Sequence, residues 1–279
     1  MSGTGMRLGI TMFATDLTME PHELAREAED RGFSSLYVPE HTHIPVSRET
    51  APPTGDAALP AEYARTLDPL VSLAAAAAVT ERITLGTGIL LPAQRDPIVT
   101  AKAVATLDRL ARGRFALGIG YGWNAEEGAA HGVPWKRRRA MVREHVLAMR
   151  ALWTEEQASF NGEFVGFDAS WSWPKPSGRV PVLLGGAPGP TLFAHIAEYG
   201  DGWLPIGGAG IREAQPGLRR ACEEAGRPMV PIVPFGTLPT PGKLAFYASL
   251  GIEEVVLRVP AGGRDAVLPL LDEYERSYL

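Results

Sequence analysis

Three glycines interrupt an apolar run in the segment FALGIGYGW, residues 115–123, where a strand meets the following turn. Glycine at such a place lets a ligand or another backbone come very close, because no side chain stands between them. A dinucleotide-binding turn has the pattern G-x-G-x-x-G between a strand and a helix. Gly118 and Gly120 satisfy its first two glycines, but Trp123 occupies the third. The glycines therefore predict that a ligand or another backbone lies close to this turn, but they do not identify which.

A second glycine-rich segment, LLGGAPGPTLF at 183–193, precedes a helical pattern and is a candidate anion site. Backbone N–H groups at a helix N-terminus have no partner within the helix, and the positive end of the helix dipole favours phosphate. The glycines and prolines could instead only form a tight turn between strand and helix. Further glycine turns at the same predicted end of the molecule favour phosphate binding.

His41 lies in the segment PEHTHIP, directly after a strand-like run. An imidazole can act as a general acid or base, or it can hydrogen-bond a cofactor ring. A histidine that only stabilises its own loop is the alternative. His43 stands two residues further on, but no other histidine or carboxylate has the spacing of a metal site. We therefore expect no metal ion here.

Eight strand-like runs, each followed by a helix-like segment, must position these residues. The runs are 7–13, 34–39, 82–90, 114–120, 181–186, 202–207, 230–236 and 254–259. Most are continuously apolar, which is typical of parallel strands that are covered on both faces. Eight alternating βα units predict the α/β class and a single (β/α)₈ TIM barrel over residues 1–279, a fold of about 250 residues in general.

Helix signals and two insertions complete this plan. Asp96 can cap a helix that Pro97 opens and Gly113 closes. One insertion follows strand 2, from Glu40 to Thr66; connections after barrel strands lie on the catalytic face, so it is a candidate lid. The other, residues 160–179, comes before strand 5 and is predicted to reach the opposite end unless it folds over.

The composition excludes several classes of function. A net charge of -5 offers no electrostatic footprint for nucleic acid. No apolar stretch approaches the ~20 residues that span a bilayer, and the first residues lack the apolar core of a signal peptide. We therefore expect a cytoplasmic protein without a membrane or nucleic-acid partner. Cys222 is the only cysteine, which excludes an internal disulfide, and it is interpreted as a bystander.

Several quoted segments together resemble the luciferase-like monooxygenase family. They are LYVPEHTHIP, LGTGILLPAQRDPIVTAKAVATLDRLARGRFALGIGYGW (85–123), GVPWKRR and LLGGAPGPTLFAHIAEYGDGW. The similarity covers the chain from Arg7 onward and is greatest to the actinobacterial members that use the deazaflavin coenzyme F420. The ordered set is specific, whereas any one glycine turn is common.

The resemblance implies a barrel that binds a flavin or deazaflavin at the C-terminal ends of its strands. The family has a bulge after strand 3 with a non-prolyl cis peptide behind the middle ring, which matches Gly88 and Ile89. Its acidic and histidine positions after strand 2 match Glu40 and His41. The positions implied to bind the cofactor are Glu40, Thr87, Gly88, Ile89, Gly120, Gly122, Gly185, Gly186, Ala187 and Gly189.

The resemblance also assigns the turn after strand 4. Gly120 and Gly122 would let the backbone approach the cofactor, and Trp123 would wall the substrate side. The sugar-phosphate dehydrogenase branch of the family has a catalytic glutamate at the place of Trp123, so its absence argues against that chemistry. Glu126 and Glu127 either help to bind the cofactor or form the exposed start of a helix.

These observations predict an oxidoreductase that transfers a hydride between coenzyme F420 and a small organic substrate, with His41 as the catalytic residue. One alternative is an FMN-dependent monooxygenase of the same family, which uses reduced flavin and oxygen. A second is a barrel that binds a ligand without turnover. Trp171 and Trp173, together with Tyr121 and Trp123, suggest an apolar or planar substrate. Family members are often dimers, so a homodimer is a further expectation.

Overall fold

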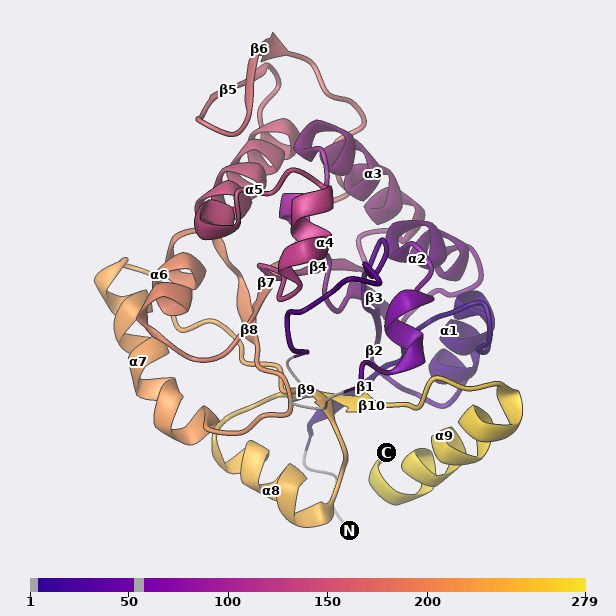
Figure 1. Cartoon of the computed structure of the whole chain (residues 1–279). Helices are drawn as coiled ribbons and strands as arrows, with labels where there is room; N and C mark the ends of the chain where they lie inside the picture. The colour runs from indigo at the N-terminus through magenta and orange to yellow at the C-terminus, as the bar shows by residue number, and fades with distance from the viewer. Residues whose placement is uncertain (1–4, 53–57) are drawn as a thin grey trace.

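The structure, a computed structural model, describes residues 5–52 and 58–279 and contains the predicted barrel. Eight parallel strands follow one another around it in the order β8–β7–β4–β3–β2–β1–β10–β9 (Figure 1). They are β1 (Arg7–Thr11), β2 (Ser35–Val38), β3 (Thr84–Thr87), β4 (Phe115–Ile119), β7 (Val182–Gly185), β8 (Gly202–Leu204), β9 (Phe235–Thr237) and β10 (Glu254–Arg258). The α/β class and the (β/α)₈ architecture are confirmed.

The barrel is nearly closed, and its weakest seam lies between β8 and β9. Within residues 5–52 and 58–279, the pairing between the segments around these strands consists of two isolated bridges, Trp203 to Ile232 and Ile206 to Phe235, instead of a regular ladder. The sequence predicted a strand over 230–236, but regular strand structure is confined to β9. Pro231 and Pro234 explain the difference, because proline has no N–H to donate to a neighbouring strand.

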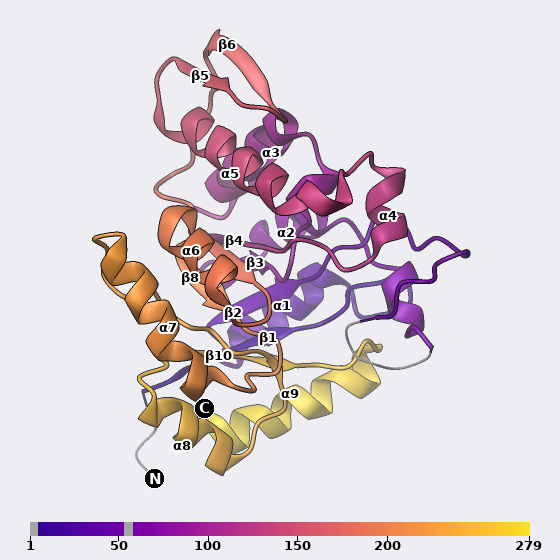
Figure 2. The same cartoon turned by 60° about the vertical axis from the view of Figure 1, so that its left-hand side comes forward.

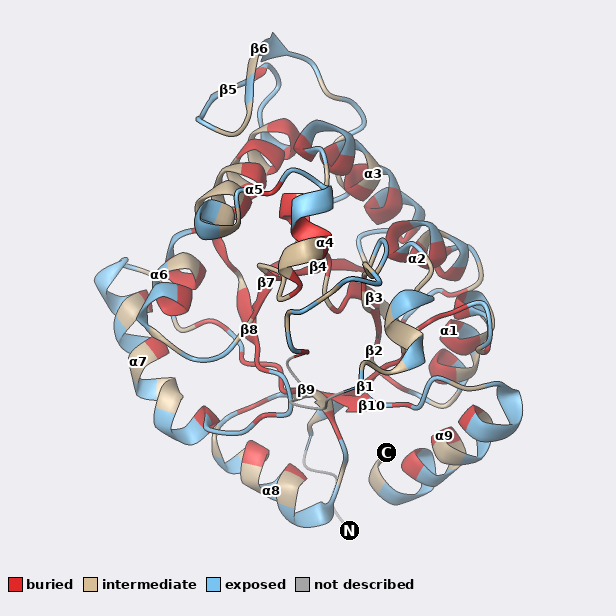
Figure 3. Ribbon diagram, in the orientation of Figure 1, coloured by how far each residue is buried: buried red, intermediate tan, exposed pale blue. Residues whose placement is uncertain are grey.

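Helices surround the sheet and turn their apolar sides inward (Figure 3). They are α1 (Pro21–Asp30), α2 (Pro69–Ala77), α3 (Pro97–Leu110), α4 (Ala125–Ala130), α5 (Arg138–Thr154), α6 (Pro190–Tyr199), α7 (Ile211–Glu224), α8 (Pro241–Ser249) and α9 (Arg264–Tyr278). The predicted cap of α3 is confirmed, since the Asp96 side chain accepts a hydrogen bond from Val99 N at 2.8 Å. Such caps fix where a helix begins, and therefore where the loop between a strand and the next helix ends.

Two apolar layers hold the fold together. A large cluster fills the space between strands and helices. A smaller one fills the barrel interior and consists of Tyr37, Ala116, Leu183, Leu204, Val233, Phe235 and Val256, with Ile89 packed against it. Because side chains fill the interior, the fold leaves its ends for a ligand.

The two insertions lie on different sides of the molecule. The first crosses the C-terminal end of the barrel, where α4 also lies (right side of Figure 2). The second contains an antiparallel hairpin, β5 (Ala158–Asn161) and β6 (Gly166–Ser170), which the sequence analysis did not predict. The hairpin lies beside α5, and Glu163 at its tip pairs with Arg137. The loop between the strands is residues 162–165 and contains Gly162, and two strand-like runs separated by 3–5 residues with a glycine are a recognised hairpin signal.

Two further features concern the described residues, 5–52 and 58–279. None of the helices there is long and apolar enough to cross a membrane. No group of three or more histidine, cysteine, aspartate or glutamate side chains is arranged to hold a metal ion.

Candidate active site

The glycines of the β4 strand and its turn admit the end of β3. A Cβ on Gly118 would lie 2.0 Å from the Thr87 carbonyl oxygen, and one on Gly120 would lie 1.9 Å from Cδ1 of Ile89. Both contacts are far inside van der Waals distance. A larger residue at Gly118 would push the β3 backbone away, whereas one at Gly120 would displace the Ile89 side chain. Within the protein, the group that comes closest to the segment FALGIGYGW is therefore the end of β3 with Ile89.

The bulge after β3 contains the non-prolyl cis peptide expected from the resemblance, between Gly88 and Ile89. Hydrogen bonds join it to β4: the Thr87 hydroxyl and Leu90 N both donate to the Gly118 carbonyl, at 2.6 and 2.8 Å. Ile89 lies between two glycines, because its Cγ2 is 3.2 Å from the place where a Cβ of Gly185 would be. The turns after β3, β4 and β7 therefore meet around one side chain.

Glu40 ties the end of β2 to the same bulge. Its carboxylate is buried and accepts hydrogen bonds from Leu91 N at 2.7 Å and from Arg95 Nε at 2.6 Å. Burial raises the pKa of this carboxyl above its usual value, against the opposing effect of Arg95. Glu40 thus holds the loop that follows the cis peptide.

His41 is held at three points. Its Nδ1 lies 2.8 Å from Oε2 of Glu127, and both side chains are almost fully buried, 7% and 1% exposed respectively. Its backbone N–H donates to the hydroxyl of Thr66, which in turn donates to the His41 carbonyl. The other oxygen of Glu127 accepts from Thr42 N at 3.2 Å. These contacts fix both the ring and the backbone of His41.

An aromatic cluster from three different strand ends surrounds this imidazole. The centroid of the His41 ring lies 5.3 Å from that of Tyr63 and 5.8 Å from that of Trp123. Phe13, which follows β1, packs on Tyr63 at 4.7 Å, and the Arg48 guanidinium lies 5.6 Å from the Trp123 ring centroid. Sequence reasoning found Trp123 and His41 but missed Phe13 and Tyr63, because nothing in the sequence says how the first insertion folds back.

Glu126 and Glu127 are adjacent in the sequence but have different environments. Glu127 is buried, whereas Glu126 is only partly buried and accepts hydrogen bonds from Glu49 N, Thr50 N and the Thr50 hydroxyl. These bonds, the Thr50 hydroxyl first among them, lower the pKa of Glu126 to about 2. Glu126 therefore joins the first insertion to α4 by hydrogen bonds, while Glu127 contacts His41. The alternative of an exposed helix start does not describe Glu127, which is buried.

The predicted phosphate loop joins β7 to α6. Gly186 has a φ of +146°, a conformation that strongly favours glycine, and Trp203 Nε1 donates to its carbonyl at 3.0 Å. No side chain caps α6 at Gly189. Among the described residues, no atom lies within 4 Å of the place where a Cβ of Gly189 would be. The start of α6 thus has uncapped N–H groups beside open space.

A second polar group connects this loop region to the turn after β4. The Tyr121 hydroxyl lies 2.8 Å from His195 Nδ1 and 3.1 Å from the Tyr199 hydroxyl, and both partners belong to α6. Burial raises the pKa of Tyr121 and lowers that of His195. On either side of Gly122, the Tyr121 side chain therefore contacts α6 and the Trp123 side chain lies near His41. Gly122, with φ +75°, permits this change of direction.

Trp171 and Trp173, expected to indicate the kind of substrate, lie elsewhere. They are 71% and 60% exposed, and Lys102 of α3 donates to the Trp173 carbonyl. The residues that surround His41 do not include them. The suggestion of a planar substrate therefore rests on Tyr63 and Trp123.

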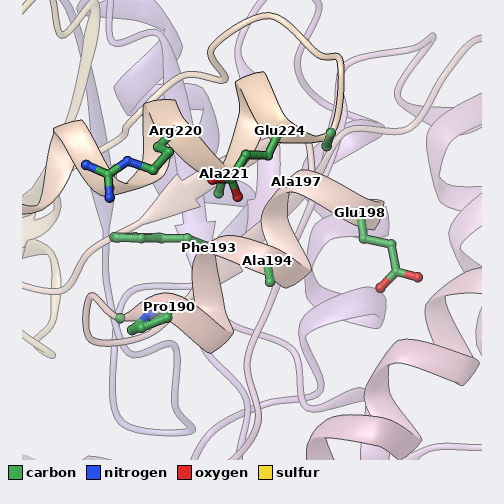
Figure 4. A pocket seen from close by; sticks show the side chains of 11 residues that line it. Pro190, Phe193, Ala194, Ala197, Glu198, Arg220, Ala221 and Glu224 are labelled. Atoms are coloured by element: carbon green, nitrogen blue, oxygen red, sulfur yellow. The ribbon is translucent and has the colours of Figure 1, made fainter.

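An open groove of about 800 Å³ lies between α6 and α7, outside the barrel (Figure 4). Phe193 and Ala197 line it from α6, and Ala221 lines it from α7. It begins at Gly189 and Pro190 but contains neither His41 nor the cis peptide. The candidate active site is thus the C-terminal end of the barrel, where the strand-end turns converge.

This fold and arrangement of turns define a known class of protein. The chain belongs to the luciferase-like monooxygenase family, whose model matches residues 18–238. A relative in Mycobacterium tuberculosis, described as an uncharacterized protein, is 49% identical over 265 residues, or 93% of this chain and 94% of the relative.

Two further comparisons give named activities. The F420-dependent glucose-6-phosphate dehydrogenase of Intrasporangium calvum is 36% identical over 189 residues, which is 66% of this chain. This chain spans only about half the length of that enzyme, 52%. The crystal structure of the monooxygenase RslO1 from Streptomyces bottropensis superimposes with a TM-score of 0.77 at 21% identity and covers 98% of both chains, which supports the fold.

Proposed function

We propose that this protein is an oxidoreductase that binds the deazaflavin coenzyme F420 at the C-terminal end of the barrel and transfers a hydride between it and a small organic substrate. Family membership and the similarity to an F420-dependent dehydrogenase support this proposal. The observation that carries it is the convergence of strand-end turns beside a fixed histidine: Glu40 accepts a hydrogen bond from Leu91 N after β3, and Glu127 after β4 holds His41.

The residues present fit such a coenzyme. The loop Gly185–Gly189 and the uncapped start of α6 suit its phosphate, because N–H groups and the helix dipole favour an anion there. Gly88 and Ile89 would lie behind its ring. The bound deazaflavin would supply a carbon that gives or accepts a hydride, and the protein has to orient it and exclude water.

His41 is the group best placed to move the accompanying proton. Hydride exchange at a carbon that bears oxygen leaves a proton to be taken up or released at that oxygen, and an imidazole does this near neutral pH. Because Trp123 stands where the sugar-phosphate branch is expected to have an acid, we propose a substrate other than a sugar phosphate. Tyr63 and Trp123 suit a planar or apolar one.

An FMN-dependent monooxygenase is the second candidate, favoured by the family as a whole and by the structural similarity to RslO1. Equilibrium titration of the purified protein with F420 and, separately, with FMN at one salt concentration distinguishes the two. Tight binding of F420 with weak binding of FMN supports our proposal. Preference for FMN favours the monooxygenase, and binding of neither overturns both. If F420 binds but no acceptor ever reoxidises its reduced form, the barrel binds without turnover.

A charge placed at the start of α6 tests the phosphate site. In Gly189→Asp the new side chain has room and suits a helix N-terminus, so the fold is retained, but its carboxylate repels a phosphate. We expect F420 affinity to fall by about tenfold or more, ~1.4 kcal/mol. The matched control is Gly178→Asp, at another glycine with open space around it. Equal affinities for the two variants would contradict this location of the phosphate.

A further inference from the structure

We infer that Glu127 is a positioning residue that fixes the tautomer of His41, so that Nε2 is the ring atom that exchanges a proton with substrate. The inference rests on the proposed function for its catalytic meaning, although its structural part stands without any cofactor. Neither the family match nor the relatives assign a role to this carboxylate.

The environment of Glu127 departs from that of a typical glutamate in the first turn of a helix. Such residues are normally solvated, yet this side chain is 1% exposed. Burial of a carboxylate is costly unless hydrogen bonds and charge partners compensate. The structure offers two partners, His41 Nδ1 at 2.8 Å and Thr42 N at 3.2 Å, and both belong to the segment that follows β2. The carboxylate is thus committed to His41 and its neighbour.

Local sequence explains why Glu127 occupies this place. Asn124 caps α4, and its Oδ1 accepts a hydrogen bond from Glu127 N at 3.3 Å. Gly128 then lets Trp135 pack against the helix, since a Cβ there would be only 3.1 Å from the indole. The cap and this packing set the rotation of α4. As a result Glu127 faces inward and Glu126 faces the first insertion.

The chemistry of the pair determines the tautomer. An ionised carboxylate only accepts hydrogen bonds, so the hydrogen of the neutral His41 ring must be on Nδ1. Nε2 then carries the lone pair, and it has no hydrogen-bond partner among the described residues. Proton uptake at Nε2 gives an imidazolium that the same carboxylate stabilises, as in other carboxylate–histidine pairs. In the opposite direction Nε2–H donates the proton, so the pair serves either direction of hydride transfer.

The other side chains around the pair do not change which nitrogen of His41 meets the carboxylate. Tyr63 and Trp123 contact the ring of His41. Thr42 also bonds to His131 Nε2, and burial lowers the pKa of His131. In the described chain Glu127 is therefore the acidic side chain that meets His41, and it does so at one nitrogen.

The first test uses the protein without cofactor. Nitrogen-15 NMR of the histidine rings reports which nitrogen carries hydrogen, and His41→Gln identifies the His41 signals. We expect the Nδ1–H form in the wild-type protein at neutral pH. The Nε2–H form, or a mixture of both, would overturn the inference. Because no coenzyme is present, this result is independent of whether F420 binds.

The second test replaces the carboxylate. In Glu127→Gln the amide can accept from Thr42 N through its oxygen while its NH₂ group faces His41, which favours the opposite tautomer. We expect the Nδ1–H signal to be lost and kcat to fall by about 10²- to 10⁴-fold with KM changed far less. Glu126→Gln, the neighbouring glutamate, is the control for the NMR signal, which should not change.

Two results separate positioning from a merely structural role. A structural role would let glutamine substitute, with the tautomer and kcat retained, and that result would overturn the inference. If Glu127→Gln does not fold, Glu127→Asp serves instead: it keeps the charge but shortens the reach, so the Nδ1–H form should persist with a smaller loss of kcat. If Glu127→Asp shows the Nε2–H form, or keeps the wild-type kcat, Glu127 does not position His41.

Discussion

Buried carboxylates at the two ends of the barrel have different kinds of partner. At the N-terminal end, Glu29 accepts hydrogen bonds from the backbone N–H groups of Glu81, Arg82 and Ile83. At the C-terminal end, Glu127 is paired with the imidazole of His41. Backbone donors are fixed and always protonated, whereas an imidazole gains and loses a proton near neutral pH. One end is therefore built to stay in one state, and the other can change its protonation.

A second carboxylate at the N-terminal end extends the contrast. Asp201 accepts from Val182 N at 2.9 Å and pairs with Arg150 and Arg179. Burial acts to raise the pKa of Asp201, but these partners outweigh it and hold the pKa below its usual value. The comparison thus predicts that substitutions at the two ends affect different quantities: activity at the C-terminal end and stability at the N-terminal end.

The largest effect is expected at His41. His41→Gln removes the group that exchanges the proton, so turnover with F420 and its substrate should fall by about 10²- to 10⁴-fold. Binding of the coenzyme should change little. The measurement is steady-state turnover alongside fluorescence titration. His43→Gln, an exposed histidine two residues away, is the matched control. If His41→Gln turned over about as fast as the control, the proposal that His41 exchanges the proton would be wrong.

A smaller but still substantial effect is expected at Gly118. The added methyl of Gly118→Ala would lie 2.0 Å from the Thr87 carbonyl oxygen, a backbone atom that cannot rotate away. We expect a loss of about 1–3 kcal/mol in the free energy of unfolding, because overpacking forces the backbone to shift. The bulge with Ile89 would move as well, so F420 affinity should fall. Urea denaturation measures the free energy of unfolding. A variant as stable as the wild type would disprove the close approach of Gly118 to the Thr87 carbonyl. Gly178→Ala is the control.

Asp201→Asn should lower stability without altering turnover. We expect a loss of about 1–3 kcal/mol at pH 7, since hydrogen bonds to a charged group are lost. The sign with pH follows from the lowered pKa. The stabilisation is fully present above the unfolded pKa, near ~3.9, and is lost as pH falls through the folded pKa. Urea denaturation at pH 7 and near pH 3 should therefore show a difference from wild type that shrinks in acid. A difference independent of pH would contradict this.

The smallest effect is expected at Glu126. Its carboxylate holds the first insertion through Glu49 N and Thr50, and its pKa of about 2 keeps it charged at every working pH. Glu126→Gln should speed hydrogen–deuterium exchange of the residue 49 and 50 amides while the urea midpoint stays unchanged. Unchanged exchange would mean that other contacts hold the insertion.

The sequence predicted the parts of this molecule that depend on local patterns. Apolar runs located the strands, and Asp96 with Pro97 located the start of a helix. The cis peptide at Gly88 and Ile89 came from the resemblance to a family and not from any pattern. Its position on the chain was confirmed.

What the sequence did not predict depends on contacts between distant segments. Glu126 and Glu127 look equivalent in the sequence, and only the rotation of α4 separates them. Ile89 packs against Gly120, a contact that the sequence did not indicate. Tyr63 reaches His41 because the first insertion folds back across the barrel. Such relations need coordinates, because Tyr63 lies 22 positions after His41 along the chain.

The most direct test of the account is a crystal structure of the protein with oxidised F420 bound. We predict that the coenzyme ring lies against Gly88 and Ile89, within reach of His41 Nε2, and that the phosphate lies at the first turn of α6 beside Gly189. A ring seated in the groove between α6 and α7, or a phosphate far from Gly186 and Gly189, would contradict it.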